Sequence, residues 1–495
     1  MINKDVFIII KTLNNSDSYL KVVNSLKRRK NGSTVADICA ATALPLSTVR
    51  ELLPKAADEY RGRLQVTQSG EILYLFPDGF KSRYRGFGVW LKRAAQTGAA
   101  FIKLGLSFLF KVWIMVMLIG YFVLFLALAL ASVFISVASK SSGRGGKGGS
   151  SIGINLIELL IRIWFYSEMT KPRYGNRNVT RKKKDSRPMH KAVFSFVFGE
   201  DDPNKDWQER QSRAIIAYIQ ANRGVISLAE YMAFTGESGT DAEQNLLSFC
   251  SKYAGSPEVT EEGTIVYRFD ELLLRADKFK LGELSPPVKR LKVFSFNSKT
   301  MNGWFTAINA VNLFFGSYFL YQSFSAGQLL TEIQYKTASF LYSNTYYFLQ
   351  MVSSDPEGII RNVLGLTPFL FSLFFWLIPA VRHFFEKNEN EEIKLANFKR
   401  FSFGKIWSSP SNIDAEKFFR VPDGECLPKD INEASDRVIK DMGAIFVPEI
   451  EQDEEGKMIY SFKELENEKR ALEKYREGVD PARSLIGKTV FDSGE

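Results

Sequence analysis

The side chains that most often carry out chemistry are few in this sequence, and they lie far apart. The 495 residues include two histidines, His190 and His383, and three cysteines, Cys39, Cys250 and Cys426. A zinc or iron–sulfur site needs clustered thiolate or imidazole ligands, and the sequence has no CxxC pair. General acid–base catalysis lacks its usual side chains as well. We therefore expect no metal site, no cofactor and no catalytic residue.

Two basic residues, Arg50 and Lys55, are candidates for contact with DNA. They lie in "STVRELLPKAADEY", which has the pattern of a helix. Lys and Arg side chains neutralise phosphates, and this supplies most of the non-specific affinity for DNA. The acidic neighbours Glu51, Asp58 and Glu59 dilute that charge. Nucleic acid is therefore an unlikely partner, and it stays open only for this first part of the chain.

One pair of opposite charges lies inside an apolar stretch. Glu158 and Arg162 are four residues apart in "IGINLIELLIRIWFY", so a helix would place them on one face. They are either part of an ion path inside a membrane or a pair that neutralises itself at the membrane edge, and we favour the second interpretation. The segment 152–168 is accordingly either a short transmembrane helix or an amphipathic helix on the membrane surface.

A dense basic run follows that stretch. The four residues of "RKKK" are Arg181, Lys182, Lys183 and Lys184. A basic cluster beside an anionic leaflet gains about 1 kcal/mol per Lys or Arg. We predict that the run anchors the chain to anionic lipids of the cytoplasmic leaflet, and the alternative is a solvated linker.

Long uncharged segments lie between the charged groups described above and must position them. A helix needs about 20 apolar residues to cross the hydrocarbon of a bilayer. No residue between Lys111 and Lys140 is charged, and two further apolar runs follow later in the chain. We predict transmembrane helices at 112–139, 301–322 and 362–381. The intervening loop 323–361 has few basic residues and is expected on the extracytoplasmic side.

Three short strands repeat at equal intervals between the apolar segments. "GEILYLF", "GTIVYRF" and "GKMIYSF" begin at Gly70, Gly263 and Gly456, which are 193 residues apart. Three helical patterns precede each of the first two strands, and the third copy is partial. Three helices followed by a hairpin are the layout of a winged helix.

The later copies are acidic where a winged helix would meet DNA. The wing of a DNA-binding winged helix contacts phosphate, which carboxylates repel. The acidic residues of the two later wings are Glu258, Glu261, Glu262, Glu449, Glu451, Asp453, Glu454 and Glu455. This pattern favours domains that bind proteins.

The pattern "FSFVFGEDDPNKDWQERQSRAIIAYIQANRGVISLAEYMAFTG", followed by "EVTEEGTIVYRF", resembles an uncharacterised group of bacterial multi-pass membrane proteins that has plastid relatives. The resemblance covers most of the chain and implies repeated winged-helix-like domains, but it implies no reaction. It implies a bacterial inner membrane or alternatively a plastid membrane. The basic flanks of the apolar runs and the repeat of the soluble units place both termini on the cytoplasmic side. Some relatives carry an iron–sulfur label, which the three scattered cysteines do not support.

The predicted fold is mainly α-helical with small β-hairpins, and repeated winged-helix-like domains alternate with transmembrane helices. The expected order is a first domain at 1–80, a basic juxtamembrane segment at 81–111, a transmembrane helix at 112–139, a Gly/Ser linker at 140–151, the doubtful helix at 152–168, a basic linker at 169–205, a second domain at 206–275, a linker at 276–300, a transmembrane helix at 301–322, a loop at 323–361, a transmembrane helix at 362–381, a basic linker at 382–410, and a partial third domain with a C-terminal helix at 411–495.

This organisation predicts an integral-membrane scaffold or adaptor whose cytoplasmic domains bind an as yet unknown protein. One alternative is a membrane-tethered DNA-binding regulator that acts through the first domain. A transporter component is a weaker alternative, because the apolar segments contain few polar residues apart from Asn309, Asn312 and the Glu158–Arg162 pair.

Overall fold

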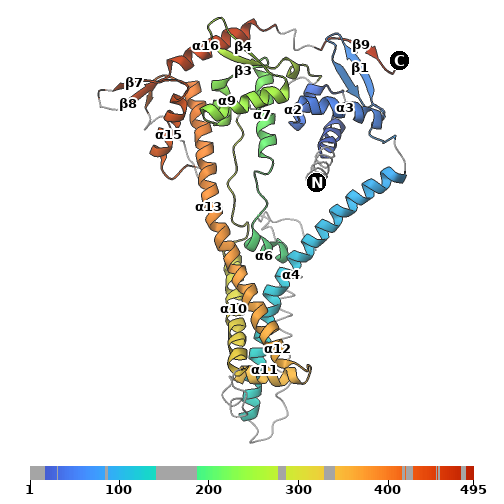
Figure 1. Cartoon of the computed structure of the whole chain (residues 1–495), viewed down its shortest axis with the longest axis vertical. Coiled ribbons are helices and arrows are strands. Elements are labelled where there is room, and N and C mark those ends of the chain that lie inside the picture. The colour runs from blue at the N-terminus through green and yellow to red at the C-terminus, as the bar shows by residue number, and fades with distance from the viewer. Residues whose placement is uncertain are drawn as a thin grey trace, which may run out of the picture. The chain divides into compact units, whose positions relative to one another are not determined.

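The structure is a computed structural model, and it describes residues 17–29, 32–83, 87–140, 187–276, 286–327, 340–414, 419, 427–452, 454, 458–480 and 486–494. The chain divides into two compact units (Figure 1). The sheet unit comprises Met1–Ala94, Asp202–Lys292 and Asn388–Glu495, and the bundle unit comprises Ala95–Asp201 and Val293–Lys387. The predicted helix at 152–168, with Glu158 and Arg162, and the basic run 181–184 lie outside the described residues.

The sheet unit combines helices with three antiparallel sheets of three strands each among its described residues. The strand orders are β2-β1-β9, β3-β5-β4 and β6-β8-β7. The strands are β1 (Arg63–Thr67), β2 (Ile72–Leu75), β3 (Val225–Ser227), β4 (Ser256–Val259), β5 (Ile265–Arg268), β6 (Ile413–Asp414), β7 (Glu449–Gln452), β8 (Met458–Ser461) and β9 (Thr489–Asp492). The prediction of a mainly helical chain with small hairpins is confirmed.

Helices precede or follow each hairpin of the sheet unit. Residues 17–27 form a helix, and the other helices are α2 (Val35–Thr42), α3 (Leu46–Tyr60), α7 (Trp207–Ala221), α8 (Leu228–Thr235), α9 (Gly239–Tyr253), the 3-10 turn η1 (Asp270–Leu272), α15 (Ile431–Gly443) and α16 (Lys463–Gly478). Their apolar faces meet in one continuous core, which includes Leu53, Ile216 and Val438.

The start of α2 and the start of α8 use the same capping chemistry, 193 residues apart. The Thr34 hydroxyl accepts a hydrogen bond from the Asp37 backbone N–H at 3.2 Å. The Ser227 hydroxyl accepts the same bond from the Glu230 backbone N–H, also at 3.2 Å. Each hydroxyl satisfies a backbone donor that the first helical turn leaves free. Both acidic residues therefore lie at the third helical position and are buried.

The first and second hairpins also turn in the same way. Gly70 has φ +82° and donates its backbone N–H to the Thr67 carbonyl at 2.9 Å. Gly263 has φ +83° and donates to the Thr260 carbonyl at 3.0 Å. A positive φ is inexpensive only for glycine, which explains the glycine that begins the first and the second repeated strand.

The bundle unit consists of long apolar helices. They are α4 (Phe87–Lys140), α6 (Met189–Phe198), α10 (Lys299–Gly327), α11 (Phe340–Gln350), α12 (Pro356–Ile359), the π-helix η3 (Ile360–Leu366) and α13 (Thr367–Ser408), whose residues from Asn388 belong to the sheet unit. Figure 1 shows α4, α10 and the first part of α13 alongside one another. The segment 323–361, expected to be a loop, contains α11 and α12.

Within the described ranges, two helical stretches are long and apolar enough to cross a membrane, by length and composition only. They are Leu104–Ile135 and Pro356–Ser408, and they overlap the predicted spans 112–139 and 362–381. The third predicted span, 301–322, is part of α10, but it is not apolar enough by composition to be counted with these two. Its polar residues, among them Asn309 and Asn312, lower its hydropathy.

Those two asparagines are fully buried and bond to neighbouring helices. The Asn312 side-chain amide donates to the Leu118 carbonyl at 2.7 Å, and the Asn309 amide donates to the Ser372 carbonyl at 3.0 Å. Interhelical hydrogen bonds of this kind contribute to helix association in apolar surroundings. The polar residues of α10 thus join α10 to α4 and to α13.

Candidate functional site: contacts made by the hairpins and the C-terminal helix

Two buried carboxylates hold later segments of the chain against earlier ones. Asp37, whose side chain is fully buried, accepts from Arg275 Nε at 3.2 Å and from the Ala276 backbone N–H at 3.0 Å. Arg29 Nη1 lies 3.2 Å from the same carboxylate. The segment that follows the second hairpin is therefore joined to the N-terminal end of α2.

The equivalent contact at α8 is made by the C-terminal helix. Glu230 is 2% exposed and accepts from Arg476 at 2.5 and 2.9 Å and from the Tyr218 hydroxyl at 2.7 Å. A buried carboxylate is costly unless its oxygens are paired, so removing Arg476 would leave an uncompensated charge. Burial and the neighbouring Glu230 carboxylate together raise the pKa of Tyr218. The contact joins α16 to the start of α8.

An acidic residue of α16, Glu468, also contacts this end of α8. Glu468 accepts a hydrogen bond from the Ala229 backbone N–H at 3.4 Å. Anionic side chains are favoured at a helix N-terminus, where backbone donors are free. Burial nevertheless raises the pKa of the Glu468 carboxyl, and the nearby Glu230 charge acts in the same direction.

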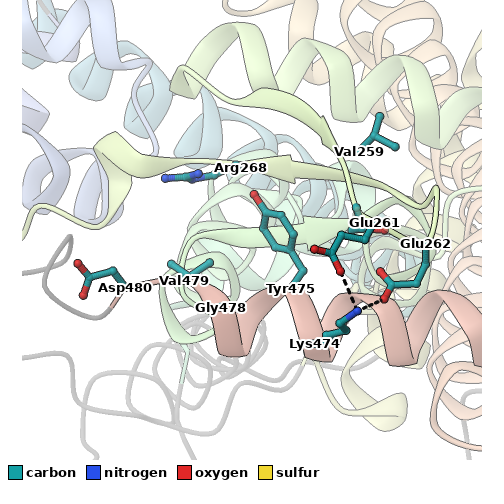
Figure 2. A pocket seen from close by; sticks show the side chains of 10 residues that line it. Val259, Glu261, Glu262, Arg268, Lys474, Tyr475, Gly478, Val479 and Asp480 are labelled. Atoms are coloured by element: carbon teal, nitrogen blue, oxygen red, sulfur yellow. Dashed lines mark hydrogen bonds and ion pairs between the residues drawn. The ribbon is translucent and has the colours of Figure 1, made fainter.

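A cavity of about 450 Å³ lies between α16 and the second hairpin (Figure 2). Val259 and Arg268 line it from the hairpin, and Lys474, Tyr475 and Val479 line it from the helix or just beyond its end. Its walls are therefore both apolar and charged.

The charges around this cavity pair with one another. Lys474 Nζ lies 2.9 Å from Glu261 and 2.6 Å from Glu262, as Figure 2 shows. Arg268 lies 2.8 Å from Asp270 and 3.4 Å from Glu258. These contacts form an ion-pair network without a nucleophile and base arranged for catalysis. Of these pairs, the two made by Lys474 join α16 to the hairpin, whereas those of Arg268 lie within the hairpin region.

The first hairpin is also in contact with polypeptide from the C-terminal region. Strand β9 pairs antiparallel with β1, in the register Gln65↔Asp492 and Val66↔Phe491. The Ser493 backbone N–H donates to the Leu64 carbonyl at 2.9 Å. The first hairpin thus contacts the C-terminal region through a strand, and the second hairpin contacts it through a helix.

The described thiols have no features of a reactive or metal-binding site. Cys39 and Cys250 are free and buried. Burial raises the pKa of the Cys39 thiol to about 12 and that of the Cys250 thiol to about 11, so both stay protonated at neutral pH. No group of three or more His, Cys, Asp or Glu side chains that could hold a metal occurs in the described part of the chain.

The two candidate DNA contacts, Arg50 and Lys55, both lie on α3 and both pair with carboxylates. Arg50 Nη2 lies 2.8 Å from Glu271, and Lys55 Nζ lies 2.6 Å from Glu51, one helical turn away. The Arg50 side chain is 54% exposed and that of Lys55 is 57% exposed. Both remain accessible from solvent while their charges are partly balanced.

Sequence reasoning did not identify the contacts of Arg476, Arg275 and β9. The partners of these contacts are separated by more than two hundred residues. One available signal was the 193-residue interval itself, because it places Asp37 and Glu230 at equivalent positions. An acidic residue that is repeated next to a capping hydroxyl indicates a position that needs a cationic partner.

Comparison with known proteins gives one informative relative. An uncharacterized chloroplastic protein of Arabidopsis thaliana is 26% identical to this chain over 399 residues, which are 76% of this chain and 70% of the relative. No protein-family model matches the sequence, and no solved structure matches it. The chloroplastic name of this relative agrees with the resemblance to plastid proteins that the sequence suggested.

Proposed function

We propose that this chain is an integral-membrane scaffold whose bundle unit lies in the bilayer and whose sheet unit binds protein partners. The exposure of the apolar helices supports the membrane part. Only 22% of the most apolar window of Leu104–Ile135 and 33% of that of Pro356–Ser408 are buried within the protein. Large exposed side chains such as Trp113 and Phe374 need an apolar environment. In this proposal α10 crosses the bilayer as well.

The sheet unit is proposed to contain three winged-helix-like domains, the third of them partial. The order α7, α8, α9 and hairpin supports this for the second domain, and the helix at 17–27 with α2, α3 and hairpin supports it for the first. The three hairpins also share one register, Leu64↔Tyr74, Pro257↔Tyr267 and Ile450↔Tyr460.

The observation that carries the protein-binding proposal is what the hairpins already contact. In a DNA-binding winged helix the hairpin is the wing that touches phosphate. Here β9 pairs with the first hairpin, and α16 pairs its Lys474 with acidic residues of the second. Surfaces that hold polypeptide and carry carboxylates are suited to proteins rather than to a polyanion.

The proposed location is a plastid-type or bacterial cytoplasmic membrane, with the sheet unit on the side of the soluble partners. The chloroplastic name of the relative supports the plastid alternative. The basic run Arg181–Lys184 is proposed to rest against anionic lipids of the same side.

The experiment that tests this function compares DNA with protein partners. The full chain in lipid nanodiscs is titrated with duplex DNA at about 50 and about 200 mM salt. We expect no salt-sensitive binding, and proximity labelling from the sheet unit in native cells should return a reproducible set of soluble proteins. DNA binding that is lost in the variant Arg50→Glu/Lys55→Glu would instead support the membrane-tethered regulator.

A further inference from the structure

The outer edges of the three hairpins offer a comparison within one chain. Leu64, Pro257 and Ile450 each pair with the tyrosine of the repeated strand, so they occupy the same place on β1, β4 and β7. Each of these first strands has one side on its hairpin partner and one side facing outward. What lies on the outward side differs among the three.

The first edge is closed by a strand of the same chain. Leu64 accepts from the Ser493 backbone N–H and donates its own N–H to the Ser493 hydroxyl, both at 2.9 Å. Thr67 bonds in the opposite direction, to the Glu71 carbonyl of its own hairpin. Because backbone groups alternate sides along a strand, the backbone of the Leu64 position points outward.

The second edge lacks a hydrogen-bond donor at that position. Pro257 has no backbone N–H, and proline on an edge strand is a common means of preventing strand addition. The sheet order β3-β5-β4 nevertheless forms normally around this proline. Proline at the outward position is therefore compatible with this hairpin.

The third edge has neither a covering strand, as the first edge has, nor a proline at the outward position, as the second has. Strand β7 lies at the end of its sheet, no described strand pairs with its outer side, and all four of its residues are exposed. Ile450 is 58% exposed, and the nearby Val447 is 69% exposed. Glu449 and Glu451 flank Ile450, and Glu449 already pairs with Lys463 of α16. With two carboxylates beside one lysine, the edge is still acidic as well as apolar.

We propose that the outer edge of β7 accepts an extended segment of a partner protein in which Lys or Arg alternates with apolar residues. Strand addition supplies main-chain hydrogen bonds, and alternate side chains supply specificity. The pairing of β9 with β1 shows that this edge geometry accepts a strand. Two copies of β7 would bring their carboxylates together, which disfavours self-pairing. The inference rests on the proposed function and names the surface that serves it.

The test uses the full chain in a neutral detergent and a fluorescent peptide of about ten residues with alternating lysine and valine. The decisive variant is Ile450→Pro, which removes one outward N–H and copies the residue present at Pro257. The matched control is Ile450→Val, which keeps the N–H and the strand preference. We expect Ile450→Val to bind like the native chain and Ile450→Pro to bind at least tenfold more weakly. Amide exchange of 449–452 should slow when the peptide binds.

Several outcomes would overturn the inference. These are no peptide binding by the native chain, equal binding by Ile450→Pro, or equal binding of a peptide with glutamate in place of lysine. A dimer that Ile450→Pro converts to a monomer would show that a second copy occupies the edge. If proximity labelling in cells is unchanged in Ile450→Pro, the scaffold function stands and partners bind elsewhere. DNA binding by the chain would remove the function itself, independently of the peptide result.

Discussion

Arg476 illustrates how much one side chain contributes to the attachment of α16. It pairs with Glu230, which is 2% exposed, so its loss would leave a carboxylate buried without compensation. We expect Arg476→Met to destabilise the sheet unit by about 3 to 5 kcal/mol. Denaturant unfolding of the full chain in detergent measures this.

The control for that variant lies on the same helix. Arg470 pairs with Glu466 at 2.6 Å, but its side chain is 71% exposed. Exposed pairs contribute little, and we expect Arg470→Ala to cost less than about 1 kcal/mol. Equal effects of Arg476→Met and Arg470→Ala would contradict the role assigned to the buried pair.

Glu468 predicts a pH dependence. Burial raises its pKa above the unfolded value of about 4.3, so folding favours the protonated form and the ionised form at neutral pH costs stability. We expect Glu468→Gln, which can still accept from Ala229, to raise the unfolding midpoint at pH 7. The gain should shrink as the pH falls through the raised pKa towards that unfolded value. Unfolding curves across this pH range test the sign, and a lower midpoint at pH 7 would refute it.

Single-residue chemistry was only partly predictable from the sequence. The glycines that begin the repeated strands, Gly70 and Gly263, were informative because a positive φ is a local requirement. The partner of Glu230 was not predictable, because a cation 246 residues away leaves no local pattern. Arg50 was singled out by its charge, whereas its pairing with Glu271 depends on how the first and second hairpin regions pack.

At the scale of elements, α10 and the π-helix pack through glycine. A Cβ on Gly365 would lie 3.0 Å from the backbone of Leu320, and one on Gly316 would lie 2.9 Å from the backbone N of Phe369. Small residues at such crossings let helices approach closely in membranes. We expect Gly365→Leu to destabilise the bundle unit by about 1 to 3 kcal/mol, because overpacking forces the backbones apart.

Thermal unfolding in detergent measures this effect, and α10 supplies its own control. A Cβ on Gly303 would meet nothing within 4 Å. Gly303→Ala should therefore be neutral, or stabilising by up to about 1 kcal/mol through helix propensity. A bundle that tolerates Gly365→Leu as well as Gly303→Ala would show that the close crossing does not matter.

The sequence predicted elements best where composition is uniform. The uncharged run before Lys140 predicted a long helix, and α4 contains this run. The sequence predicted a helix less clearly at α10, which contains polar residues, and at α11, which is rich in tyrosine and other aromatic residues. A hydropathy scale scores Asn309 and Asn312 as unfavourable in an apolar helix. It does not count the hydrogen bonds that their side-chain amides donate to backbone carbonyls of neighbouring helices. The segment 323–361 was predicted only as an extracytoplasmic connection, from its few basic residues, and the helices at 340–350 and 356–359 within it were not predicted.

At the scale of the whole molecule, β9, the last described strand, pairs with β1 of the first hairpin. We expect a chain that lacks residues 486–494 to keep its first hairpin, because β1 still pairs with β2. The outward amides of Leu64 and Val66 should then exchange about tenfold faster or more. The amide of Gln65, which faces β2, serves as the internal control. Unchanged exchange at Leu64 and Val66 would show that β9 does not protect this edge.

The pairing of β9 with β1 could not be predicted from the sequence, because β9 has only four residues. Three of them are exposed and the fourth is half-buried. Such a short strand has no hydrophobic period of its own. Its place is decided by the free edge of β1 and by bonds such as that between Gln65 and Asp492, at 2.7 Å. The alternation of polar and apolar segments was visible in the sequence, whereas the pairing of β9 with β1 was not.

The separation between β1 and β9 also has a consequence for biosynthesis. Gln65 and its partner Asp492 are 427 residues apart. At ribosomal speeds of about 5 to 20 residues per second, the first hairpin waits roughly 20 to 85 s for its third strand. In the proposed membrane topology, the apolar helices of the bundle unit are inserted into the bilayer during the same interval. Elongation rate and chaperone supply should therefore govern how much correctly assembled protein a cell obtains.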